Sequence, residues 1–234
     1  MINSNFTQTA RKKFLTNKNW NKIFCIGYNK TGTTTLEGVL KLYGLKLPNQ
    51  QEQELRLTKQ CFSCNYTPLI EFASKYEAFQ DLPFSQGEVY VACDALFPNS
   101  KFILTERDSE AWYNSMVTFH KKIFNISNID SLTEIDIIEK YNYLYPGYFH
   151  ENKKRLLTNF HGKVATVHWE LLYNKDYYIS TYEERNNRIK KYFQNCPEKL
   201  LVVDITTTQD TKEILGFFKI PEEFNIPMPK LNQT

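Results

Sequence analysis

The fold predicted for this chain depends on one stretch, Gly27-Tyr28-Asn29-Lys30-Thr31-Gly32-Thr33-Thr34. It follows the apolar run 23–26 and leads into apolar residues at helical spacing, Leu36, Val39, Leu40 and Tyr43. These patterns predict a buried strand, a turn bounded by glycines and a helix. In that arrangement free backbone N–H groups and the positive end of a helix dipole point at one place, which is typical of a phosphate-binding site.

The stretch differs from a Walker A loop, G-x-x-x-x-G-K-[ST], in the position of its lysine. Thr33 stands where the Walker lysine would be, and Lys30 lies inside the loop. This displacement favours phosphate binding of a kind other than Mg-ATP hydrolysis.

Length and composition set further bounds. With 234 residues, 41% of them hydrophobic, the chain suits one sizeable α/β domain, expected over residues 21–234 after an N-terminal extension over 1–20. A net charge of +3 does not indicate a nucleic-acid binder. The basic N-terminal stretch lacks the apolar core of a signal peptide, and no run is apolar enough to span a membrane. We therefore expect a cytoplasmic protein; no signal for an oligomeric state is visible.

Metal binding is not expected. The five cysteines are scattered, and the single C-x-x-C of Cys61 and Cys64 has no second pair to complete a zinc site.

Strands and helices alternate along the chain. Apolar runs predict strands at 22–27, 101–105, 163–167 and 200–205, with a weaker one at 76–81. Helical patterns occur at 33–43, 67–75, 87–97, 109–124, 133–144, 177–193 and 212–218. Such alternation predicts a mostly parallel sheet flanked by helices on both faces, with ligands beyond the carboxyl ends of the strands.

A second informative stretch follows the strand predicted at 101–105. Arg107 would lie at the carboxyl end of that strand, on the same rim as the first loop, and Asp108 or Ser109 can cap the next helix. The planar guanidinium of Arg107 suits a phosphate dianion, and Ser115, eight residues on, can add a hydroxyl. The alternative is a surface arginine paired with Asp108 or Glu106.

Together the two stretches resemble the sulfotransferases that use 3′-phosphoadenosine 5′-phosphosulfate (PAPS). Their 5′-phosphosulfate loop reads approximately P-K-[ST]-G-T-T, which residues 29–34 match, and their 3′-phosphate segment is a strand followed by Arg and, eight residues later, Ser. The resemblance extends over residues 22–232 and implies a three-layer P-loop-like α/β fold. It assigns the donor site to Lys30, Thr31, Gly32, Thr33, Thr34, Thr35, Arg107 and Ser115.

The resemblance also implies a reaction. Sulfuryl transfer requires alignment and charge stabilisation, and Lys30 would neutralise the charge on the leaving oxygen without a metal. Cytosolic relatives take the acceptor proton with a His in a K-x-H-x-P segment; here residues 79–83 put Asp81 at that position, as in bacterial-type relatives. Burial would have to raise the pKa of Asp81 for it to act as a base. His120 is a rival base, and Asp81 could instead only shape the turn before Pro83.

The chain departs from the family pattern in two ways. Thr35 replaces the Trp that stacks on adenine in cytosolic relatives, and their C-terminal R-K-G segment is absent. Tyr182 and Arg185 are candidates for contact with adenine. The acceptor, a small molecule, sugar or lipid, is not readable from the sequence. A nucleotide kinase or NTPase, or a non-catalytic nucleotide-binding module with the same fold, are the alternative functions.

Overall fold

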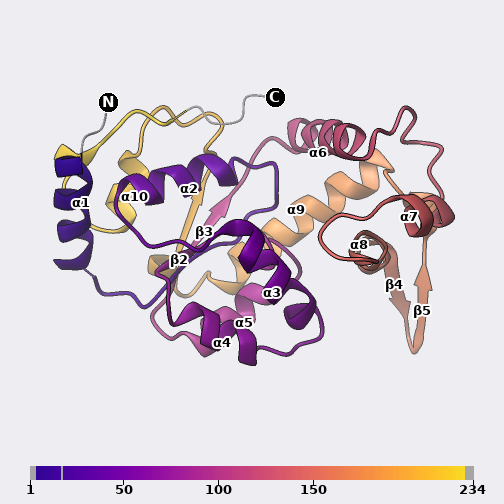
Figure 1. Cartoon of the computed structure of the whole chain (residues 1–234), viewed down its shortest axis with the longest axis horizontal. Coiled ribbons are helices and arrows are strands. Elements are labelled where there is room, and N and C mark those ends of the chain that lie inside the picture. The colour runs from indigo at the N-terminus through magenta and orange to yellow at the C-terminus, as the bar shows by residue number, and fades with distance from the viewer. Residues whose placement is uncertain (1–3, 17, 230–234) are drawn as a thin grey trace. The chain divides into compact units, whose positions relative to one another are not determined.

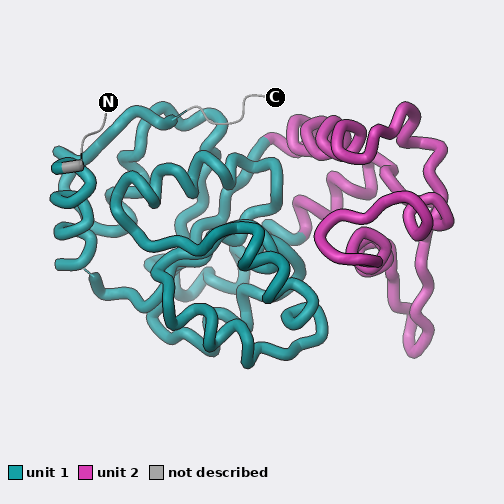
Figure 2. Tube along the Cα trace, in the orientation of Figure 1, with its two compact units in different colours: residues 1–107, 185–234 teal, residues 108–184 magenta. Residues whose placement is uncertain are grey.

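A computed structural model describes residues 4–16 and 18–229 of the chain. The chain divides into two compact units, unit 1 with residues 1–107 and 185–234 and unit 2 with residues 108–184 (Figure 2). The single domain expected over residues 21–234 stays a prediction.

The helices and strands of both units are labelled in Figure 1. Unit 1 contains α1 (Ser4–Thr16), β1 (Ile23–Cys25), α2 (Thr33–Leu42), α3 (Gln50–Phe62), α4 (Thr67–Ala73), β2 (Ala78–Phe79), α5 (Val89–Leu96), β3 (Lys101–Thr105), β6 (Leu200–Val203) and α10 (Lys212–Phe217). Unit 2 contains α6 (Ser109–Phe124), α7 (Glu134–Lys140), α8 (Tyr148–Leu157), β4 (Thr158–His161) and β5 (Val164–Val167). Helix α9 (Lys175–Tyr192) includes the last residues of unit 2 and re-enters unit 1 at Arg185. Short 3-10 turns occupy Trp169–Leu171, Pro197–Lys199 and Glu222–Phe224.

The sheet of unit 1 has four parallel strands in the order β2-β1-β3-β6. Strand β1 lies at the centre, with Phe24 opposite Phe79 on one side and opposite Phe102 on the other. Because the strands are parallel, the loops that follow β1, β2 and β3 leave the sheet at the same edge. This edge carries the stretch that begins at Gly27.

Helices cover both faces of this sheet, so the predicted α/β fold with three layers is confirmed. Side chains alternate along β1: Ile23 and Cys25 pack into a core with α1, α2 and α10. Phe24 and Ile26 point to the other face, where the core is built with α3, α4, α5 and the end of α9. The same grouping of helices can be followed in Figure 1.

The strand predicted at 163–167 exists but its assignment as a buried parallel strand is wrong. It is β5, which pairs antiparallel with β4 in a hairpin of unit 2. Val164 is 63% exposed. A short apolar run does not reveal whether its strand enters the main sheet, and the turn at Gly162, with φ of +61°, returns the chain directly onto the preceding strand.

Three helices were not predicted from the sequence: α1, α3 and α8. Their sequences are rich in charged and amide side chains, which hides the apolar face. Within the expected N-terminal extension, α1 nevertheless buries Ala10 and Phe14 in the core of unit 1.

Unit 2 holds a buried lysine among aromatic rings. Lys153 is 3% exposed, and its amine lies 4.9 to 5.2 Å from the ring centroids of Phe149, Tyr173 and Tyr178. Within the described part of the chain no carboxylate forms an ion pair with it. Burial lowers the pKa of Lys153 from 10.5 to about 7.

We expect Lys153 to make the stability of the protein depend on pH. Below pH 7 the lysine is charged in both states and the folded state bears the full cost of burying that charge. As the pH rises from 7 toward 9, only the unfolded chain keeps the proton, so the free energy of unfolding rises. Lys153→Met should increase stability at pH 6 and flatten this rise, measured by urea denaturation. The exposed neighbour provides the control, Lys154→Met, which should retain the wild-type slope; an unchanged slope in Lys153→Met would contradict the account.

Candidate functional site

The stretch after β1 forms a tight loop against β3. A Cβ atom on Gly27 would lie 2.1 Å from Thr105 Oγ1, so only glycine allows this approach of the two strands. Thr31 is fully buried, and its hydroxyl lies 2.6 Å from Thr105 Oγ1 and donates to the Tyr28 carbonyl. These contacts fix the loop to the sheet.

The end of the loop starts helix α2. Lys30 and Gly32 have φ of +73° and +91°, and α2 begins at Thr33. Thr33 and Thr35 are buried, whereas Thr34 is exposed. Because the N-cap residue is Gly32, no N-cap side chain satisfies the first backbone N–H groups of α2. These groups and the positive helix end suit an anion.

Arg107 lies two residues beyond β3 and contacts the loop. Its Nη1 donates a hydrogen bond to the Lys30 carbonyl at 3.3 Å. The neighbouring carboxylates have other partners: Glu106 is 2.8 Å from Lys190. Asp108 accepts from Ala111 N at 2.8 Å, which confirms the predicted cap of α6. The two sequence stretches that suggested a phosphate site therefore meet within unit 1.

Ser115, the further residue expected at the donor site, lies on α6 in unit 2 and is half-buried.

Asp81 lies two residues beyond β2 and is also connected to the loop. It is 7% exposed and has a φ of +64°. Its Oδ1 accepts hydrogen bonds from the Asn29 amide and from Leu82 N, the latter at 3.0 Å. Ser85 Oγ in turn donates to Asn29 Oδ1 at 3.2 Å. Asp81 is therefore bound to Asn29, the residue directly before Lys30 in the loop. This bond connects the two residues expected to act in catalysis, Lys30 and Asp81.

The surroundings of Asp81 make it a stronger base than an exposed aspartate. Burial raises the pKa of Asp81 from 3.8 to about 6, with a smaller contribution from the negative charge of Glu37. The hydrogen bonds from Asn29 and Leu82, and the charge of Lys30, act in the opposite direction. At neutral pH the carboxylate is mostly ionised and able to accept a proton.

His120, the rival base, belongs to an aromatic cluster of unit 2. Its Nδ1 is 2.9 Å from Tyr173 Oη, and its ring centroid lies 5.3 Å from that of Phe149. The rings of residues 119–150 also pack on one another, with Phe124 and Phe149 at 4.6 Å.

The two residues considered for adenine have contacts of their own. Tyr182 is 2% exposed and stacks on Trp112 with a centroid distance of 4.3 Å. Arg185 is fully buried and donates to the carbonyls of Ile26 and Gly87, at 2.9 and 3.2 Å. Its guanidinium also lies 4.7 Å from the Tyr28 ring. Arg185 thus supports the end of β1 beneath the loop.

Sequence reasoning missed the side chains that α3 contributes next to Asp81. Gln50, Gln53 and Glu54 lie on one face of this helix; Gln50 and Gln53 bind residues 80–82, and Glu54 accepts a hydrogen bond from Gln50. Their spacing, continued by the buried Leu57, is the i, i+3, i+4, i+7 pattern of a helix face. With Asn49 as an N-cap signal, that pattern could have revealed α3 in the sequence.

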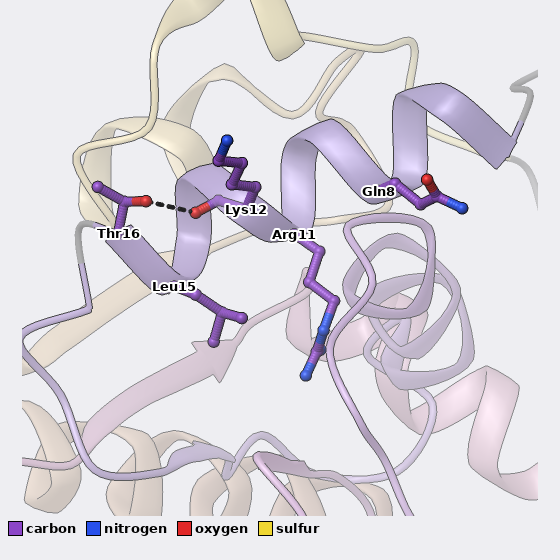
Figure 3. A pocket seen from close by; sticks show the side chains of 5 residues that line it. All are labelled: Gln8, Arg11, Lys12, Leu15 and Thr16. Carbon is purple, nitrogen blue, oxygen red and sulfur yellow. Dashed lines mark hydrogen bonds between the residues drawn. The ribbon is translucent and has the colours of Figure 1, made fainter.

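A surface hollow of 430 Å³ lies along α1 (Figure 3). It is lined by Gln8, Arg11, Lys12, Leu15 and Thr16. None of these residues was predicted for the site, and the Arg11 guanidinium is bound to Glu77 at 2.8 Å. None of the described helices combines the length and the apolar character needed to cross a bilayer.

Comparison with known proteins identifies the family. A family model described as a sulfotransferase domain matches residues 22–234. The chain therefore belongs to the sulfotransferases, and the resemblance seen in its sequence is confirmed. The match extends over residues of both units and leaves α1 outside. A search of curated proteins finds no match to this chain.

The Thr31 hydroxyl should be required for stability. Thr31→Val keeps the shape of the side chain but leaves the buried Thr105 hydroxyl without its partner in the loop. We expect the free energy of unfolding to fall by about 1–3 kcal/mol, the cost of an unsatisfied buried polar group. Urea denaturation measures the change. Thr34→Val, at an exposed position in the first turn of α2, should stay within about 0.5 kcal/mol of wild type, and equal losses in the two variants would contradict the anchoring role of Thr31.

Proposed function

We propose that this sulfotransferase uses PAPS as its donor and transfers the sulfuryl group to a hydroxyl or amine of a small-molecule, sugar or lipid acceptor. The type of reaction, sulfuryl transfer, follows from membership of the sulfotransferase family. The contact between Arg107 and the Lys30 carbonyl supports the choice of donor, because it joins two anion-binding elements at one edge of the sheet.

The loop fits the 5′ end of the donor. The N–H groups of residues 31–34 and the exposed Thr34 hydroxyl would bind phosphate and sulfate oxygens. The hydroxyl of Thr31 is already used to hold the loop on β3, so Thr31 contributes through its backbone. Thr33 and Thr35, which are buried, would act mainly by shaping the first turn of α2.

Arg107 would bind the 3′-phosphate, the group that distinguishes this donor from ATP. A guanidinium suits a phosphate because it is planar, always charged and presents its N–H donors in a fork. Ser115 would add a hydroxyl, as the family pattern assigns.

The chemistry would depend on Lys30 and Asp81. Asp81 accepts the proton of the acceptor as its oxygen or nitrogen forms the bond to sulfur. Lys30 offsets the negative charge that develops on the bridging oxygen as the bond from sulfur to that oxygen breaks. Adenosine 3′,5′-bisphosphate is the second product. The pKa of about 6 at Asp81 supports its part, since a general base works best with a pKa near the working pH.

Isothermal titration calorimetry with adenosine 3′,5′-bisphosphate and with ADP, both without metal, tests the donor. We expect wild type to prefer the bisphosphate and Arg107→Ala to lose that preference, by about 10-fold or more for one charge-assisted contact. Equal affinities, or binding of ADP only with Mg²⁺, would favour a nucleotide kinase instead. Bisphosphate binding without turnover on any acceptor would indicate a non-catalytic module.

Asp81→Asn should separate binding from turnover. The amide keeps the size of the side chain but cannot accept the proton, so turnover should fall by about 10²-fold or more. Release of the bisphosphate from PAPS, followed with a panel of phenols, amines and saccharides, measures the rate. The affinity for the bisphosphate should stay within about threefold of wild type, because Asp81 is not expected to contact the donor's phosphates. A fully active variant would exclude Asp81 as the base and direct attention to His120.

A further inference from the structure

Helix α3 brings a second buried carboxylate to Asp81. Gln50 Nε2 lies 2.9 Å from Glu54 Oε1 and 3.1 Å from Asp81 Oδ2, so one amide group donates to both carboxylates. Gln53, on the same face of the helix, donates to the carbonyls of Gln80 and Leu82 at 2.6 and 2.7 Å. The backbone on both sides of Asp81 is therefore fixed to α3.

We propose that Glu54 is a positioning residue for the reaction: bridged to Asp81 by Gln50, it forms a carboxylate pair in which ionised Glu54 makes Asp81 a stronger base. This inference rests on the proposed role of Asp81 as the base. Glu54 itself does not touch the acceptor, and no proton passes through the Gln50 amide.

Burial makes the two charges interact. Glu54 is 6% exposed and Asp81 is 7% exposed, so little water screens them from each other. Burial, followed by the charge of Asp81, raises the pKa of Glu54 to about 7, above that of Asp81, so Asp81 ionises first. A buried pair of this kind loses its two protons in separate steps. After the second step both carboxylates are ionised, and each is more basic than it would be alone because the other is negatively charged.

The charged groups around the pair come from three further segments. Lys30 of the loop and Glu37 of α2 act on Asp81 with opposite signs, and the Asn29 amide donates to it. Directly after β2, Gln80 Nε2 donates to Gln50 Oε1 at 3.3 Å and so orients the bridging amide. Lys30 is the positive group among them.

One acceptor in this network has no donor. Gln80 is 4% exposed, and its Oε1 has no hydrogen-bond partner among the described residues. A buried acceptor is costly when it is left unsatisfied, by about 1–3 kcal/mol.

The test follows the carboxyl ¹³C resonance of Asp81 by NMR as a function of pH. The measurement uses wild type, Glu54→Gln and the control Glu52→Gln, which removes an exposed carboxylate of the same helix. Asp81→Asn identifies the resonance. We expect two steps in wild type and in Glu52→Gln. In Glu54→Gln we expect a single step, because the second inflection of Asp81 depends on the charge that Glu54 acquires. A superimposable Asp81 titration in wild type and Glu54→Gln would overturn the proposal.

The same wild-type spectra keep the test valid if Glu54→Gln does not fold. A single Asp81 step with no second inflection where the Glu54 resonance titrates would also overturn the coupling. If the variant folds, the acid limb of its pH–rate profile for bisphosphate release should lose the contribution of the second Asp81 step, and the maximal rate should fall several-fold because the base is weaker. A rate profile that does not move would overturn the role in the reaction. Absence of turnover in wild type, with the NMR shift present, would instead contradict the proposed function.

Discussion

The structure depends on the close approach of β1 to β3 at Gly27 and Thr105. A side chain at Gly27 would collide with Thr105, at 2.1 Å, and the Thr31 hydroxyl binds the same threonine at 2.6 Å. This contact determines the path of the loop as it leaves the sheet. Arg107, two residues after Thr105, then lies within 3.3 Å of the Lys30 carbonyl. A packing constraint between two strands thus brings two positive side chains to one edge.

Asp81 joins this edge because β2 is the other neighbour of β1. Parallel strands end at the same side of the sheet, so Asp81, two residues beyond β2, lies near the residues that follow β1. The Asn29 amide makes the link, and α3 encloses the carboxylate from the other side. Burial by these groups is the largest cause of the raised pKa of Asp81. The unfavourable desolvation of one carboxylate is what gives the proposed reaction its base.

Local patterns in the sequence predicted much of this arrangement. Short-range spacing and turn chemistry determine the strand, loop and helix around residues 22–43 and the cap at Asp108. These features could therefore be predicted from the sequence. The partners of Asp81 were not, because Gln50 and Glu54 lie on a polar helix whose apolar face is narrow. The hairpin of β4 and β5 escaped prediction for another reason: pairing partners depend on tertiary contacts. Lys153, buried among rings, likewise carries no local signal.

In the proposed donor site, the backbone N–H groups of the loop of residues 27–34 bind the 5′ end of a nucleotide donor. Backbone amide NMR resonances of Thr31, Gly32, Thr33 and Thr34, recorded during titration with adenosine 3′,5′-bisphosphate, test it most directly. We expect the chemical shifts of these four amides to change together as the bisphosphate is added. We also expect their hydrogen–deuterium exchange to be slower in the complex than in the free protein. Binding of the bisphosphate with these amides unmoved, and shifts confined to other elements, would contradict it.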